Sequence, residues 1–266
     1  MPAKHHPVAT KLAERLHLAD SSSRLLGPAD HTLFAEQVRE GYQSCEEPEI
    51  EILTASFAAR FLPATVEAYK SAPHLITPYA TMLRILLDSG YYAKFMRSTS
   101  GRDLYKLHAE RLADLDFDLR TASVEGMESV TAILVFLMVY SDHYHRNVES
   151  LSRDTKDKLI TTLGVVQKFY QTTSCQQPEI AAAIFRHARD GEQFLKGTLK
   201  SENMLGAVGR MMPWITCGGH DTGCWAKGKQ KGRLGCARCE TQTYCSKEHQ
   251  KADWPVHKKS CFETVY

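Results

Sequence analysis

Apolar positions between residues 30 and 212 recur every three or four residues, the spacing that places side chains on one face of an α-helix. Leu53, Phe57 and Phe61 follow this spacing after Pro48, a residue that suits the first turn of a helix. We find no alternating Val/Ile/Thr runs joined by Asn-Gly turns, which would favour a sheet. The pattern predicts an all-helical domain over residues 30–212.

Capping signals divide this region into successive helices. Helix-start signals stand at Thr77-Pro78, Ser123, Ser152 and Pro178. Gly90 is placed to end the helix that begins at Pro78. The apolar run from Val130 to Tyr140 is about half of the roughly 20 residues that span a bilayer, so it predicts a buried core helix and no membrane segment.

One short internal similarity leaves the helical architecture open. The segment Cys45–Ile50 resembles Cys175–Ile180, and the offset is close to three armadillo or HEAT repeats. The same similarity arises if proline followed by glutamate is simply a good way to begin a helix. We therefore expect a mainly α fold, either a helical bundle or an armadillo/HEAT-like solenoid.

Residues 1–29 are expected to form an N-terminal segment that is partly flexible. They lack the apolar stretch of a secretory signal, so we expect an intracellular protein of the cytoplasm or nucleus. The formal net charge of +2 gives no strong electrostatic indication of nucleic acid or membrane as a partner. The sequence shows no recognisable catalytic motif either, and we expect no enzyme.

Composition changes near residue 213, and residues 213–266 form a second predicted unit. Six of the eight cysteines fall there, in a stretch too short to bury a useful core. In a reducing compartment such clustering, interleaved with histidine, indicates metal rather than disulfides. The tail and the helical domain are expected to have separate cores, so that zinc removal would unfold the tail alone.

The spacing of these residues predicts two closed zinc sites. Cys236-x2-Cys239 is the tight turn that lets two thiolates reach one ion, while Cys245-x3-His249 and His257-x3-Cys261 each place two ligands one helical turn apart. Cys217 and Cys224 bring the number of candidate ligands to eight. Sites with four protein ligands are structural rather than catalytic.

The first pair has a competitor. His220 lies three residues after Cys217 and four before Cys224, so it could replace either one as a ligand. We favour Cys217 and Cys224, because both are cysteines and Cys224 lies at the more usual distance before Cys236.

The tail resembles the MYND-type zinc finger. The matching positions are Tyr244-Cys245-Ser246, Gln250, Asp253-Trp254, His257-Lys258 and Cys261, with His249 standing where the family usually has cysteine. The resemblance implies that the ligands interleave. Cys236, Cys239, His257 and Cys261 would hold one zinc ion, and the first pair with Cys245 and His249 would hold the other.

The resemblance also implies a partner. MYND fingers act mainly as protein-interaction modules that bind proline-containing peptides, and Gln250 and Trp254 match positions that line the peptide groove. An indole beside an amide suits an extended proline-rich backbone. Alternatively, Trp254 fills a small core between the two zinc sites. We expect an adaptor that joins partner proteins.

The sequence leaves two other functions open. The basic stretch Lys227–Arg233 invites a nucleic-acid-associated regulator, but the thiolates and zinc ions together reduce the positive surplus of the tail. SET-MYND lysine methyltransferases carry the same type of finger. Their catalytic SET domain would require strands and a cofactor motif that we do not find in this sequence.

Overall fold

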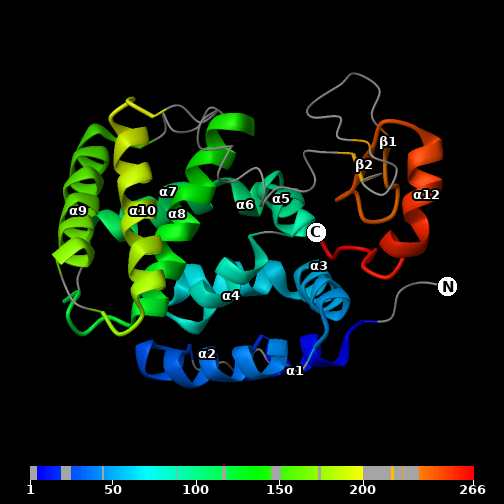
Figure 1. Ribbon diagram of the computed structural model, residues 1–266, viewed down its shortest axis with the longest axis horizontal. Coiled ribbons are helices and arrows are strands. Elements are labelled where there is room, and N and C mark those ends of the chain that lie inside the picture. The colour runs from blue at the N-terminus through cyan, green and yellow to red at the C-terminus, as the bar shows by residue number, and fades with distance from the viewer. Residues whose placement is uncertain are drawn as a thin grey trace.

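The computed structural model describes residues 5–18, 25–43, 45–87, 89–115, 118–144, 151–172, 175–199, 217–218, 224 and 234–266. Over these residues the fold is mainly α, as the periodicity predicts, and strands occur only as one short pair near the C-terminus. Figure 1 shows the helices as one body with the C-terminal unit beside it. No helix in the described part of the chain is long and apolar enough to cross a membrane.

The helices follow one another closely. They are α1 (Pro7–Arg15), α2 (Pro28–Gln43), α3 (Glu47–Ser71), α4 (Pro78–Leu86), α5 (Gly90–Met96), α6 (Thr99–Arg102), α7 (Leu104–Ala113), α8 (Val124–Tyr144), α9 (Arg153–Thr172) and α10 (Pro178–Leu195). Predicted starts at Thr77-Pro78, Ser123, Ser152 and Pro178 all lie at helix N-termini. The expectation for Gly90 is wrong, because α4 already ends at Leu86 and Gly90 begins α5.

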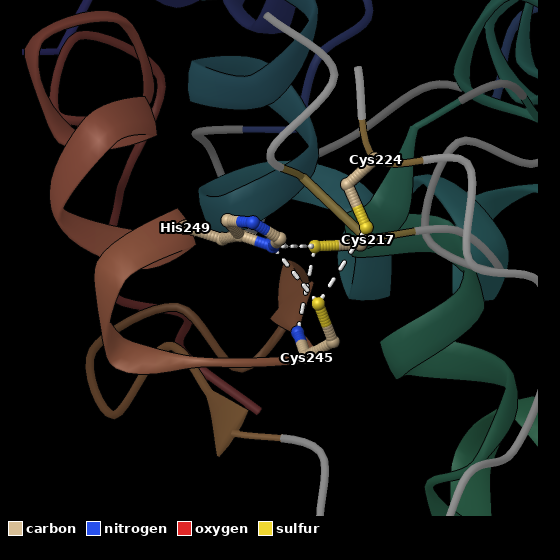
Figure 2. A group of neighbouring side chains, drawn as sticks. All are labelled: Cys217, Cys224, Cys245 and His249. Atoms are coloured by element: carbon tan, nitrogen blue, oxygen red, sulfur yellow. Dashed lines mark hydrogen bonds between the residues drawn. The ribbon is translucent and has the colours of Figure 1, made fainter. Parts of the chain in front are cut away.

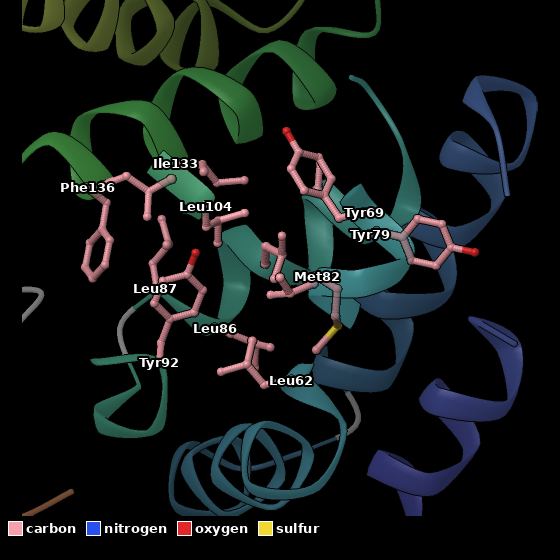
Figure 3. Packing of buried hydrophobic residues seen from close by; sticks show 14 of the residues in the cluster. Leu62, Tyr69, Tyr79, Met82, Leu86, Leu87, Tyr92, Leu104, Ile133 and Phe136 are labelled. Carbon is pink, nitrogen blue, oxygen red and sulfur yellow. The ribbon is translucent and has the colours of Figure 1, made fainter. Parts of the chain in front are cut away.

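Helix α8 lies at the centre of this body. It packs against α4, α7 and α10, and every residue from Val130 to Tyr140 is buried. This explains the continuous apolar run, since a helix covered on all sides needs no polar face. Figure 3 shows side chains of this core, among them Leu62, Met82, Leu86, Leu104, Ile133 and Phe136.

The end of α3 is held by an arginine from α7. The Arg111 guanidinium donates to the carbonyl oxygens of Tyr69, at 2.7 Å, of Ala72, at 2.8 Å, and of His74. It also lies over the Tyr69 ring, 4.8 Å from its centroid. The last carbonyls of a helix have no partner within the helix, so this fork satisfies groups that would otherwise lose hydrogen bonds on burial.

The C-terminal unit contains β1 (Leu234–Gly235), β2 (Thr243–Tyr244) and α12 (Lys247–His257). The strands pair antiparallel, with Leu234 opposite Tyr244. The Tyr244 ring is fully buried, and its hydroxyl donates to the Asp253 carboxylate of α12 at 2.6 Å. This contact ties the helix to the strand pair.

The expectation of separate cores is wrong. Buried residues of the helices and of the C-terminal unit form one continuous cluster, which includes Cys236, Cys261 and Phe262. The reason lies after the last predicted ligand, where Phe262 is buried and stacks on His5 with ring centroids 5.3 Å apart. Residues 262–266 thus connect the two units.

Candidate zinc centres

The structure brings together the first group of predicted ligands. Figure 2 shows that Cys217, Cys224, Cys245 and His249 converge. Their ligand atoms all lie within 4.8 Å of one another. The Cys224 and Cys245 sulfurs are 3.5 Å apart, and His249 Nδ1 is 3.5 Å from Cys217 Sγ and 2.8 Å from Cys245 Sγ. His249 therefore presents its Nδ1 atom to the group.

The second group is more deeply placed. Cys236, Cys239, His257 and Cys261 are all buried, and their ligand atoms also lie within 4.8 Å of one another. Cys236 Sγ is 3.6 Å from Cys261 Sγ, and Cys239 Sγ is 3.5 Å from His257 Nε2. His257 thus faces its group with Nε2, whereas His249 faces the first group with Nδ1.

Both groups have the dimensions that zinc requires. With Zn–S bonds of about 2.3 Å, two sulfurs of a tetrahedral site lie roughly 3.8 Å apart. The sulfur pairs at 3.5 and 3.6 Å are close to that value. Each group offers three thiols and one imidazole, a set that zinc binds with no open position. The residues present thus fit two zinc ions, one in each group.

Local structure explains how residues distant in sequence meet. The Cys236–Cys239 turn is closed by the Glu240 N–H, which donates to the Cys236 carbonyl at 2.9 Å. The Gly218 N–H donates to the Thr243 carbonyl at 2.9 Å and so places the segment of Cys217 beside β2. The ligand segments of the two groups therefore alternate along the chain.

The two ligand pairs around α12 differ from the expected helical turns. The helix begins at Lys247, capped by Ser246, and ends at His257. Cys245 therefore precedes the helix and Cys261 follows it. The expectation that each pair lies on one helical turn is wrong, although each helical histidine still meets its cysteine.

Hydrogen bonds within the second group favour the ionised form of the Cys239 sulfur. The thiols of Cys236 and Cys261 hydrogen-bond to Cys239 and lower its pKa to about 2. The Thr241 hydroxyl, at 3.2 Å from Cys239 Sγ, adds to this effect. The same thiol cluster raises the pKa of Cys261. Ionisation of one thiol therefore opposes ionisation of its neighbour. A divalent cation bound among them stabilises all of the thiolates together.

The predicted peptide-contacting residues lie on α12. Trp254 is 42% exposed and its ring centroid is 5.9 Å from that of His257. Gln250 lies one turn earlier on the same face and is partly exposed. The alternative position for Trp254, buried between the zinc sites, does not describe this side chain. Tyr244 occupies the buried position beside His257 instead.

Some candidate residues lie outside the described part of the chain. These are His220, the competing ligand, and the basic stretch Lys227–Arg233. Two functional residues have no signal in the sequence: Tyr91 and Lys94 of the helical domain, which contact the backbone at or beside ligands of the second group. No local pattern could have found them, because their partners lie more than a hundred residues away.

Comparison with known proteins supports this assignment. Residues 222–261 match the family model of the MYND finger. The chain therefore contains a MYND finger, a zinc-binding module that mediates protein–protein interaction, and the resemblance noted in the sequence is confirmed. No solved structure matches the chain.

Individual relatives match over the finger only. The chicken N-lysine methyltransferase SMYD2 is 46% identical over 44 residues, which cover 16% of this chain and 10% of that protein. The human Egl nine homolog 1 is 47% identical over 38 residues, 14% of this chain and 9% of that protein, and the mouse protein is equally similar. The similarity thus spans about a tenth of each relative.

Proposed function

We propose that this protein is a non-enzymatic adaptor whose finger binds proline-containing segments of partner proteins through Gln250 and Trp254. The observation that carries the proposal is the exposed indole of Trp254 on α12 in a MYND finger. Aromatic faces at the surface are the usual platform for proline-rich backbone, which loses little conformational entropy on binding.

The positive charges near Trp254 indicate which residues a bound peptide should contain besides proline. Lys251 lies one turn before Trp254 on α12, and Lys258, the residue that follows the helix, lies about one turn after it; both are exposed. Their ammonium groups favour acidic residues beside the prolines. We therefore expect the preferred segment to combine proline with aspartate or glutamate.

The test is a titration of the zinc-loaded full chain with proline-rich peptides, followed by fluorescence of a label on the peptide. Trp254→Ala is expected to weaken binding at least ten-fold, because it removes the central aromatic contact. Val256→Ala is the matched control, since Val256 is 53% exposed on the opposite side of the same helix. That variant should bind as the original chain does.

Three outcomes would contradict the proposal. One is equal binding by Trp254→Ala and the original chain, and another is no preference for acidic over lysine-flanked peptides. The third is binding to arbitrary DNA that weakens steeply with salt, which would favour the nucleic-acid alternative. Metal analysis accompanies the titration, and fewer than two zinc ions per chain would contradict the zinc centres themselves.

A further inference from the structure

The Tyr91 hydroxyl of α5 holds the chain on both sides of Cys261. It accepts the Phe262 N–H at 2.6 Å, and its one proton is shared between the Ser260 carbonyl, at 2.8 Å, and the Phe262 carbonyl, at 3.1 Å. Tyr91 is 3% exposed, so water does not replace these bonds easily. A single buried hydroxyl thus fixes the peptide groups next to a zinc ligand.

A second residue of α5 reaches the other loop of the same group. The Lys94 ammonium donates to the Cys239 carbonyl at 3.3 Å and pairs with the Glu240 carboxylate at 3.1 Å. Arg97, just after α5, donates to the Glu240 carbonyl at 3.4 Å. Glu240 has a φ of 58°, an unfavourable value for a residue with a side chain, and these contacts hold it there.

The first residue of α5 shows how closely the two units approach. A methyl group on Gly90 would lie 3.0 Å from Thr241 Cβ and 3.1 Å from the Thr241 carbonyl oxygen. Thr241 is the residue whose hydroxyl donates to Cys239 Sγ. A side chain at position 90 would therefore push α5 and the loop that supports this sulfur apart by a few tenths of an ångström.

The C-terminal residues complete the contact. The Tyr266 hydroxyl donates to the Tyr91 carbonyl at 3.0 Å, and its ring packs edge-on against Phe95. The Val265 N–H donates to the Ala59 carbonyl of α3 at 3.2 Å. That carbonyl is free because the residue four positions later, Pro63, has no N–H to donate.

We propose that α5 is part of the second zinc centre, in which Tyr91 is a positioning residue for Cys261, and that zinc in this centre in turn stabilises α5. The inference rests on zinc binding by the finger. The contacts described above flank Cys239 and Cys261, which are ligand candidates of the second group. Because coupling between two sites is reciprocal, a side chain that favours the bound geometry must itself be favoured by the metal.

The experiment measures zinc release from the full chain to a chromophoric chelator. Tyr91→Phe keeps the ring and removes the hydroxyl, so release of one of the two zinc ions should become about ten-fold faster. Repeating the measurement in a Cys224→Ser background, which disables the first group, should show the fast phase alone. This assigns the change to the second group.

Tyr92→Phe is the matched control. Tyr92 is the next residue of α5, is equally buried, and its hydroxyl has no hydrogen-bond partner in the described part of the chain. Removing that hydroxyl should leave both release rates unchanged. If both variants accelerate release equally, general loosening of α5 explains the effect and the positioning role is overturned.

Hydrogen exchange provides the reciprocal measurement. Chelation of the full chain should reduce amide protection in α5 while protection in α9 and α10 is kept, because those helices lie away from the finger (Figure 1). Unchanged amide protection in α5 after chelation would overturn the inference. The zinc centres themselves would still be supported if metal analysis gave two zinc ions per chain. A chain that binds no zinc would overturn both.

Discussion

His108 of α7 shows how a single buried residue limits stability in acid. Its Nε2–H donates to the Val130 carbonyl at 2.8 Å, and its Nδ1 accepts the Tyr69 hydroxyl at 2.5 Å, so both ring nitrogens are satisfied in the neutral form. Burial lowers the pKa of His108 from 6.5 to about 4. The unfolded chain therefore binds a proton at a higher pH than the folded chain does.

The contribution of His108 to the stability of the folded state should be lost as the pH falls from 6.5 to 4 and should stay constant below that range. For His108 alone the difference in pKa corresponds to about 3 kcal/mol. Denaturant unfolding across this range should show a correspondingly smaller loss in His108→Gln than in the original chain.

His187 gives the background for that comparison. Burial lowers the pKa of His187 to about 4 as well, and His187 is present in both the original chain and His108→Gln. The difference between the two pH profiles therefore isolates His108. Parallel profiles would show that the imidazole is not buried in neutral form.

At the scale of the elements, one arginine joins the end of α3 to α7. A lysine at position 111 could keep the charge but not the fork that reaches three carbonyls, nor the planar contact with Tyr69. We expect Arg111→Lys to lower the free energy of unfolding by about 1–3 kcal/mol. Chemical denaturation at constant zinc measures this change.

Arg102 offers the same substitution at an exposed position of α6. Arg102→Lys should change the free energy of unfolding by less than about 0.5 kcal/mol. Similar losses in the two variants would mean that the carbonyl contacts of Arg111 contribute little.

The sequence predicts those elements whose signals are local. Proline and serine caps mark the starts of α4, α8, α9 and α10, and the cysteine and histidine spacing marks both zinc groups. The contact of Tyr91 with Phe262 has no such signal, because it joins residues 171 positions apart. The expectation that Gly90 ends a helix is wrong for the same reason, since its small size allows close packing against the distant residue Thr241.

At the scale of the whole molecule, the finger completes the surface of the helical domain. Phe262 is buried against the N-terminal segment, and Tyr266 covers Phe95 of α5. A chain that ends at residue 212 would expose this apolar surface to water.

We expect the truncated chain to remain helical and to melt at least about 5 °C below the zinc-loaded full chain, because the lost contacts are worth a few kcal/mol. Thermal unfolding followed by circular dichroism measures the difference. The double variant Phe262→Ala, Tyr266→Ala in the full chain should reproduce part of it. Identical melting temperatures would show that the helical domain gains nothing from the finger.

The contacts of residues 262–266 with α3 and α5 also fix the orientation of the finger relative to the helical domain. With the C-terminal end of the finger anchored, α12, which carries the exposed Trp254, has one orientation relative to the helices. A peptide held there would meet any second binding surface on the helices at a set separation, without the entropy loss of a flexible linker. In the proposed role as an adaptor, the protein would then select partners by the spacing between their motifs as well as by the motifs themselves.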